Sequence, residues 1–220
     1  MPEVNLLDTY PRITRNIAAR AQWKSRTPEN RAIAKQFGFE YFDGTRDQGY
    51  GGYQYDGRWK AVAERMAKHY GLTGTESILD VGCAKGFLLH DFRELFPGIT
   101  VAGIDVSQYG LDHAMEDVKP FLQRANATDL PFPDKSFDVV ISINVVHNLP
   151  DALCRRALRE MERVSRRFKY LQVDAYRTPQ EKENLELWQL TAEVIHSTDQ
   201  WERMFREVGY TGEYYWTITE

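Results

Sequence analysis

From about residue 57 to its end, the chain alternates regularly between apolar and amphipathic segments. The apolar segments 77–81, 100–106, 137–143 and 168–175 are rich in β-branched residues, as buried parallel strands are. Amphipathic segments with helical spacing separate them. Strands that alternate with helices in this way form right-handed βαβ units and a parallel sheet covered on both faces. We therefore expect a Rossmann-like, doubly wound α/β fold.

Capping signals and turn residues define the remaining elements. Thr178 and Ser197 each precede a helix in a sequence typical of a capping box. Helices are predicted at residues 59–70, 87–96, 108–118 and 151–166, and after the two capping residues. Two further strands, 121–124 and 212–219, give a mostly parallel sheet of six strands. A seventh strand would need a partner hidden within residues 205–210.

The first 56 residues follow a different pattern. Segments 12–24 and 28–37 have helical character. Segment 49–59 combines glycines with tyrosines, and its apolar residues follow neither helical nor strand spacing. It therefore either packs its rings around a turn or folds over a ligand as a lid. Because glycines permit such folding, we expect the lid. The predicted organisation is an N-terminal extension of residues 1–56 and a ligand-binding domain of residues 57–220.

Composition excludes several classes of protein. With 28 basic and 32 acidic residues the net charge is -4, without the basic excess that nucleic-acid binding requires. The arginine-rich segment 155–167 is interpreted as the solvent-facing side of a helix. No apolar run approaches the ~20 residues of a membrane span, so we expect a soluble, cytoplasmic protein. Cys83 and Cys154 are not spaced as a redox pair or metal site, and we expect both to be reduced, with no bound metal.

Three polar or glycine-containing segments follow three successive predicted strands. Gly82 and Gly86 lie in a strand-to-helix turn, where the missing Cβ atoms let backbone approach a ligand. Asp105 ends the second strand, where a carboxylate can accept both hydroxyl protons of a ribose. Segment 126–132 then offers polar groups to a purine edge. Because carboxyl ends of parallel strands meet at one edge of a sheet, these segments predict a nucleoside pocket.

In combination, these segments make the chain similar to the class I S-adenosylmethionine-dependent methyltransferases. Residues 78–87 (ILDVGCAKGF) resemble the glycine-rich motif of that family, Gly103-Ile-Asp105 its ribose-binding motif, and residues 127–142 its adenine loop and fourth strand. The resemblance extends over residues 59–175. It implies S-adenosylmethionine as cofactor and S-adenosylhomocysteine as product.

The resemblance also implies a set of donor contacts. Asp105 would bind the ribose hydroxyls, and Asn126 stands opposite the adenine amino group where the family usually has aspartate; an amide oxygen can still accept that bond. Ala84 replaces the middle glycine of the motif. The family's sheet usually ends in a hairpin, of which only one strand is evident here. The other implied contacts are Asp80, Gly82, Cys83, Gly86, Val106, Ala127 and Asn144. Independently of the resemblance, we expect two cofactor contacts from the lid: Tyr53, whose ring face suits a sulfonium, and Arg58, whose guanidinium suits a carboxylate or phosphate.

Methyl transfer is an in-line displacement, and a hydroxyl acceptor would need a base whereas an amine would not. His147 follows the fourth strand and is the foremost candidate base. Asp174 and His196 are further candidates. We expect a small-molecule acceptor, an O or N atom of a sugar-derived or other polar metabolite. Residues 38–59 resemble a segment of bacterial methyltransferases linked to surface polysaccharide and capsule modification. Oligomeric state is not predicted.

Three other functions compete with this interpretation. A nicotinamide-dependent oxidoreductase would need Gly-x-Gly-x-x-Gly, whereas residues 82–86 read GCAKG. A non-catalytic S-adenosylmethionine-binding protein or partner subunit remains an alternative, although it would not need the polar residues that follow the fourth and fifth strands. Amino methylation of nucleic acid has an Asn/Asp-Pro-Pro-Tyr/Phe signature, and residues 144–147 read NVVH instead.

Overall fold

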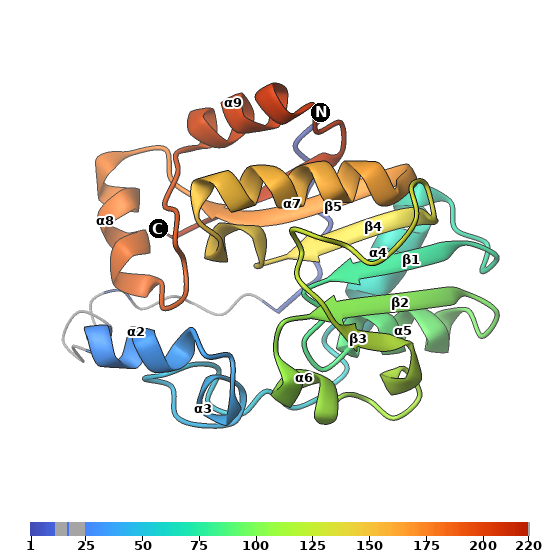
Figure 1. Ribbon diagram of the computed structural model, residues 1–220, viewed down its shortest axis with the longest axis horizontal. Helices are drawn as coiled ribbons and strands as arrows, with labels where there is room; N and C mark the ends of the chain where they lie inside the picture. The colour runs from blue at the N-terminus through green and yellow to red at the C-terminus, as the bar shows by residue number, and fades with distance from the viewer. Residues whose placement is uncertain (12–16, 18–24, 220) are drawn as a thin grey trace.

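The computed structural model describes residues 1–11, 17 and 25–219. Its centre is one six-stranded sheet with the strand order β3-β2-β1-β4-β5-β6, in which every neighbouring pair is parallel (Figure 1). This order confirms the doubly wound fold, and it places the switch point between β1 and β4. The strands are β1 Ser77–Val81, β2 Thr100–Asp105, β3 Leu122–Arg124, β4 Phe137–Ile143, β5 Ser165–Ala175 and β6 Glu213–Ile218.

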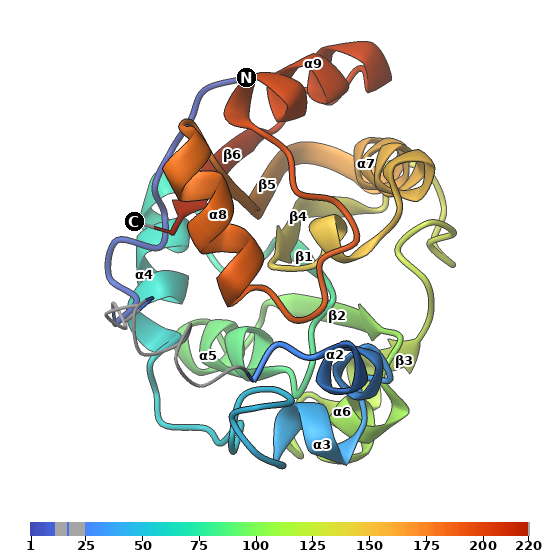
Figure 2. The same ribbon diagram turned by 90° about the vertical axis from the view of Figure 1, so that its left-hand side faces the viewer.

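Helices cover both faces of the sheet, with α4 and α5 on one face and α7 and α9 on the other (Figure 2). The α-helices are α2 Pro28–Ala34, α3 Phe39–Phe42, α4 Lys60–Tyr70, α5 Phe87–Leu95, α6 Gln108–Asp112, α7 Asp151–Val164, α8 Pro179–Trp188 and α9 Thr198–Val208. Two 3-10 turns, η1 Lys119–Phe121 and η2 Val146–Asn148, follow α6 and β4. Capping boxes at Thr178 and Ser197 are both present, as predicted.

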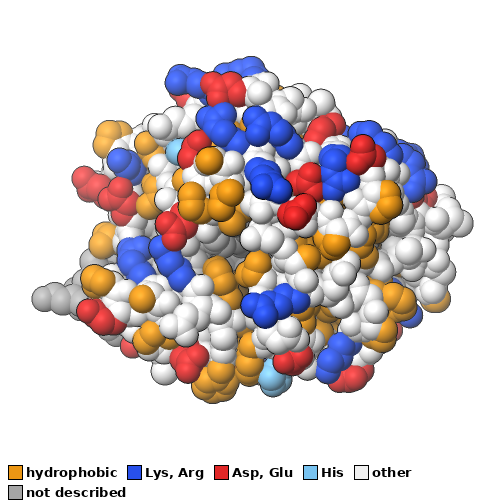
Figure 3. Space-filling model, in the orientation of Figure 1, with side chains coloured by type: hydrophobic (Ala, Val, Ile, Leu, Met, Phe, Trp, Pro, Cys, Tyr) orange, Lys and Arg blue, Asp and Glu red, His pale blue; other side chains and the backbone are white. Residues whose placement is uncertain are grey.

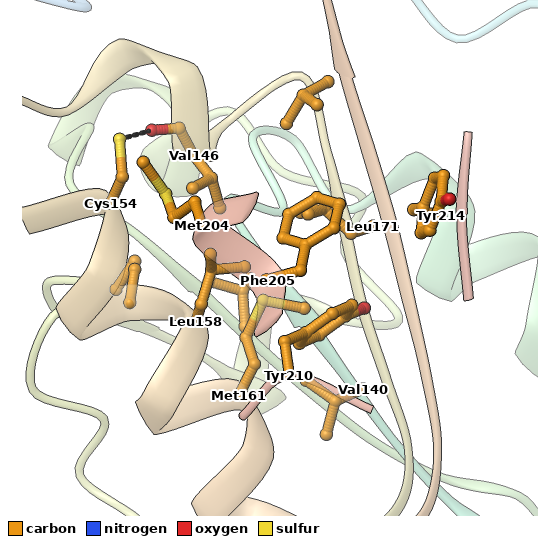
Figure 4. Close-up of a cluster of buried hydrophobic side chains, with 14 of the residues drawn as sticks. Val140, Val146, Cys154, Leu158, Met161, Leu171, Met204, Phe205, Tyr210 and Tyr214 are labelled. Atoms are coloured by element: carbon orange, nitrogen blue, oxygen red, sulfur yellow. Dashed lines mark hydrogen bonds between the residues drawn. The ribbon is translucent and has the colours of Figure 1, made fainter. Parts of the chain in front are cut away.

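Alternating residues of the strands separate two hydrophobic cores. Ile78 faces α4 and α5, whereas its neighbour Leu79 belongs to the core beneath α7 and α9. In that second core Leu158 and Met161 of α7 pack with Phe205 of α9 and the strand residues between them (Figure 4). All of these side chains are buried. This two-sided burial explains why the central strands read as continuous apolar runs.

The edge of the sheet shows whether residues 205–210 contain the partner that a seventh strand would need. Residues 205–208 continue α9 and pair with no strand, so β6 is the last strand and pairs in parallel with β5. Residues 2–4 lie along this edge, where the N–H group of Val4 donates to the Tyr214 carbonyl (2.8 Å). The N–H group of Leu6 donates to the Tyr170 hydroxyl of β5 (3.2 Å). The helix expected over residues 12–24 lies outside the described residues.

Three predicted boundaries differ from the structure by three residues or more. The helix expected over 108–118 ends at Asp112, because the N–H group of Met115 turns away to donate to the Lys85 carbonyl (3.1 Å). The first described helix ends at Ala34 instead of residue 37, where Phe37 adopts a left-handed φ of 49°. β5 begins at Ser165, three residues earlier than expected.

The surface of α7 agrees with the solvent-exposed interpretation of its arginines. Arg155 pairs with Asp151 and Glu207, and Arg163 pairs with Glu160 and Asp134. Figure 3 accordingly shows basic and acidic side chains interspersed on this face of the molecule. Among the described residues, no helix is long and apolar enough to cross a membrane.

Candidate active site

A cavity of about 110 Å³ opens at the carboxyl ends of β1, β2 and β4, next to the switch point where doubly wound sheets bind ligands. Its walls come from the glycine turn after β1, the end of β2, the loop after β3, the exit of β4 and the N-terminal segment. The lining residues are Phe37, Tyr41, Phe42, Tyr50, Gly82, Ala84, Ile104, Asp105, Val106, Ala125, Asn126, Ala127, Ile143, Asn144, Val145, Asn148 and Leu149. Asp105 is the one charged side chain among them.

The turn after β1 is built for close approach. Gly82 has φ +88°, and a Cβ atom there would lie 2.1 Å from Val145 Cγ2. Gly86, with φ +73°, precedes α5, and a Cβ atom added at this position would lie 2.8 Å from Val118 Cγ2. Ala84 also has a left-handed φ, 51°, which costs a non-glycine residue about 1–2 kcal/mol. The turn keeps this conformation because Asp105 Oδ2 accepts a hydrogen bond from the Ala84 N–H group (2.8 Å).

Asp105 is held rigidly at the end of β2. Its Oδ1 atom accepts from the Ser107 N–H group (2.8 Å) while Oδ2 accepts from Ala84, and the residue is 9% exposed. Burial raises the pKa of this carboxyl group, and the backbone N–H groups oppose that rise. Each carboxylate oxygen retains acceptor capacity beyond its one backbone bond. The geometry therefore suits a pair of ribose hydroxyl donors.

Asp80 lies deeper in β1 and is also buried. Burial, and secondarily the nearby charge of Asp105, raises the pKa of its carboxyl group to about 7. A cation close to Asp80 would favour the ionised carboxylate and lower that pKa.

The loop after β3 brings Asn126 and Ala127 to the cavity wall. Asn126 Oδ1 accepts hydrogen bonds from the N–H group of Thr128 and from its hydroxyl, both at 3.0 Å. The Asn126 carbonyl accepts from the Asp129 N–H group (3.0 Å), which closes the turn.

Aromatic rings of the N-terminal segment form the outer wall. Tyr41 and Phe42 of α3 and the neighbouring Tyr50 pack edge-on or stacked, with ring centroids 5.1–6.0 Å apart. The N–H group of Tyr50 donates to the Tyr41 carbonyl (2.8 Å), and Gly49 permits this approach because a Cβ atom there would lie 1.8 Å from the same carbonyl oxygen. Burial raises the pKa of Tyr41 to about 12. This phenol therefore remains neutral at physiological pH.

A buried ion pair fastens this segment to the glycine turn. Lys85 Nζ lies 2.7 and 2.9 Å from the two carboxylate oxygens of Asp43, with side-chain exposures of 5% and 14% respectively. Asp43 also accepts from the Tyr109 hydroxyl (2.7 Å) and the Tyr53 N–H group (3.0 Å). Although burial raises the pKa of Asp43, Lys85 and these donors lower it below its ordinary value overall. We call this network the Asp43–Lys85 clasp.

Asn144 and Asn148 line the cavity at the exit of β4, and His147 between them does not. Asn144 has a left-handed φ of 60°, which asparagine tolerates. His147 is 3% exposed, and its Nδ1 atom accepts from the Asp174 N–H group (3.3 Å). An Nδ1 atom that accepts from an amide carries no proton, so the proton of the neutral ring lies on Nε2. The Asp174 carboxylate accepts from the Gln189 amide.

Several other residues singled out in the sequence lie away from the cavity walls. His196 Nε2 is 3.0 Å from Asp151 Oδ1, and Arg58 pairs with Asp56 (Nε–Oδ1 2.8 Å). Tyr53 stacks on Phe87 with ring centroids 4.8 Å apart. Cys83 points toward Gly103, where a Cβ atom would lie 2.8 Å from its sulfur. Asn126, Ala127, Val106, Asp105, Asn144 and Gly82, in contrast, share one cavity.

Sequence reasoning missed the clasp and several wall residues, with Phe37, Tyr41 and Asn148 among them. Phe37, Tyr41 and Asn148 line the cavity, and no residue pattern distinguishes them from core aromatics or a loop amide. Both cysteines are free and buried, and burial raises the thiol pKa of Cys154 to about 12. Among the described residues, no group of three or more His, Cys, Asp or Glu side chains is arranged to hold a metal ion.

The strand order and the flanking helices together define an α/β domain of the Rossmann-like class. Residues 79–168 match a family model described as a methyltransferase domain. These residues are accordingly similar to a methyltransferase domain, a class of domain that uses S-adenosylmethionine as its cofactor. The polar and backbone groups around Asp105 and Gly82 fit that cofactor.

Relatives of known name support this assignment. A demethylmenaquinone methyltransferase of Tropheryma whipplei is 35% identical over 97 residues, which are 43% of this chain and 38% of the relative. The ubiquinone/menaquinone biosynthesis C-methyltransferase UbiE of Hahella chejuensis is 40% identical over 105 residues, 44% of this chain and 41% of the relative. This chain thus matches less than half the length of these curated relatives.

The solved structure of the YcgJ protein of Bacillus subtilis has a similar fold, with a TM-score of 0.53 and 24% sequence identity. The match covers 66% of each chain.

Proposed function

We propose that this chain transfers a methyl group from S-adenosylmethionine to a small-molecule acceptor. The observation that carries the proposal is the placement of the buried Asp105 carboxylate between the glycine turn and the Asn126 loop in one cavity. When bound, S-adenosylmethionine supplies an electrophilic methyl group on a sulfonium centre. The residues of the chain bind and orient that group, and they exclude water from its surroundings.

Several residues of the cavity wall, and Asp80 behind it, have roles that follow from their chemistry. Asp105 accepts the two ribose hydroxyls, which ionised acceptors bind strongly. The backbone at Gly82 and Ala84 contacts the methionine portion, because Gly82 has no Cβ atom in the way. Asp80 provides negative charge near the cationic portion of the cofactor, and the faces of Tyr41 and Tyr50 attract a sulfonium through their ring quadrupoles.

The acceptor is best understood from the cavity wall at the exit of β4. Tyr41, Tyr50, Asn144 and Asn148 contribute rings and amides there, without charge. This wall favours an uncharged acceptor with an apolar body and a polar group. The names of two relatives concern quinone precursors, which have this character. A sugar-derived acceptor and a role in capsule modification have no comparable support.

His147 serves better as a positioning residue than as a base. Proton uptake at Nδ1 would break its hydrogen bond with the Asp174 N–H group, and Nε2 already bears the ring proton. The bond instead joins the exit of β4 to the end of β5. Since no wall tyrosine ionises near neutral pH, the described cavity favours a nucleophile that is reactive without proton removal or that ionises readily by itself.

Residues 38–55 serve as the cover of the donor site. Ligand pockets commonly enclose about 300–1,000 Å³, and the cavity of about 110 Å³ beneath Tyr41, Phe42 and Tyr50 is smaller. Entry of a nucleoside cofactor therefore requires these rings to move. The Asp43–Lys85 clasp holds them down and so sets the free energy of opening.

Transfer of a radioactive methyl group tests the proposal. The purified protein is incubated with methyl-labelled S-adenosylmethionine and a panel of hydroquinones, phenols, amines and sugar nucleotides. Transfer to a member of the panel that exceeds the background of Asp105→Ala supports the proposal. Tight cofactor binding with no transfer to any member would favour a non-catalytic S-adenosylmethionine-binding protein or partner subunit.

A further inference from the structure

We propose that Asn126 recognises a ring-nitrogen acceptor of the cofactor purine and does not bind its 6-amino group. This inference rests on the proposed cofactor. It concerns the base edge, where Asn126 lines the cavity between Ala125 and Ala127. The starting observation is that the single oxygen of the Asn126 side chain is already fully used inside the protein.

Two donors saturate that oxygen. The Thr128 N–H group and the Thr128 hydroxyl each donate to Asn126 Oδ1 at 3.0 Å. An amide oxygen has two lone pairs, so none remains for a ligand. The orientation of the amide is also fixed, because a backbone N–H group can only donate and must face the oxygen. Exchanging the oxygen and nitrogen would set two donors against each other.

Asn126 is exposed and lines the cavity, and its NH₂ group is therefore the part of the side chain that remains available to a ligand. Among the described residues, no acceptor forms a hydrogen bond with it. An amino group on a purine is a donor, so it gains nothing from a second donor, whereas a ring nitrogen beside that amino group is an acceptor. Asn126 can accordingly donate to the ring nitrogen.

An aspartate at this position would behave differently. A carboxylate has two oxygens, so one could accept from Thr128 while the other accepted from a 6-amino group. The substitution of one oxygen by NH₂ thus changes which atoms of the base can be recognised. From the sequence alone, in contrast, we expect the amide oxygen to accept from the amino group; the two hydrogen bonds from Thr128 favour the ring nitrogen instead.

Calorimetric binding of two nucleosides provides the test. The probes are S-adenosylhomocysteine and its analogue in which hydrogen replaces the 6-amino group of the base. For the wild-type protein we expect the two dissociation constants to agree within about threefold. For Asn126→Asp we expect a preference for the adenine compound of about tenfold or more, the range of a charge-assisted hydrogen bond.

We compare the ratio of the two dissociation constants within each variant, because added charge or weakened folding affects both probes equally and cancels in the ratio. Asp105→Ala serves as the matched control, since it should weaken both probes and leave their ratio unchanged. A wild-type preference of tenfold or more for the adenine compound, unchanged in Asn126→Asp, would overturn the inference and leave the proposed function intact. Failure of the wild-type protein to bind either probe would overturn both.

Discussion

Replacing Lys85 with methionine should loosen the aromatic cover of the donor cavity. The substitution removes the cation from a pair whose side chains are only 5% and 14% exposed. Breaking a buried pair by removing one partner costs about 3–5 kcal/mol, because the other charge stays buried without compensation. Asp43 keeps the Tyr109 hydroxyl and the Tyr53 N–H group as donors. We therefore expect the lower end of that range, about 3 kcal/mol.

Urea unfolding and hydrogen exchange of Lys85→Met measure this effect. Exchange of the amides in residues 38–55 should accelerate, as should both association and dissociation of S-adenosylhomocysteine. Lys35→Met is the matched control, since Lys35 pairs with Glu193 at the surface with exposures of 37% and 38%, where a pair contributes less than about 1 kcal/mol. If Lys85→Met lost no more stability than Lys35→Met and exchange in 38–55 did not change, the clasp would not hold the cover.

Two further predictions concern buried ionisable groups. Because the pKa of Asp80 is raised to about 7 in the fold but is about 3.9 when unfolded, its contribution to stability is greatest below pH 4 and is lost as pH rises toward 7, by up to about 1.4 kcal/mol per pH unit. The unfolding free energy of Asp80→Asn relative to wild type should therefore increase between pH 5 and 7, and a pH-independent difference would contradict the raised pKa. His147→Gln should keep turnover within about threefold with an unchanged pH profile, since an amide oxygen can still accept from Asp174; a loss of tenfold or more with a flattened profile would restore His147 as the base.

Local sequence signals were sufficient for most of the fold. β4 occupies the residues expected from its β-branched run, and Thr178 and Ser197 form the capping boxes that their sequences indicate. The elements that were misjudged depend on contacts distant in the chain. α6 ends early because the Met115 N–H group donates to the carbonyl of Lys85, 30 positions earlier. The helical spacing of apolar residues contains no information about such a distant partner.

The features of the site likewise divide into those that the sequence could predict and those that it could not. The strand-end rule brought Asp105, Asn126 and Asn144 to one cavity, because their positions follow from topology alone. The pairing of Asp43 with Lys85 across 42 positions has no local signature. Nor could the sequence reveal that the ring of His147 turns toward the Asp174 amide, or that Thr128 occupies the oxygen of Asn126.

We infer that the cavity at Asp105 binds the nucleoside of S-adenosylmethionine. The most direct test of this inference is the calorimetric affinity of S-adenosylhomocysteine for wild type, Asp105→Ala and Asp112→Ala, the last removing an exposed carboxylate of α6 outside the cavity wall. Loss of charge-assisted bonds of about 1.5–3 kcal/mol predicts a tenfold to hundredfold weaker affinity for Asp105→Ala, with Asp112→Ala unchanged. Equal affinities for the three folded proteins would contradict the inference.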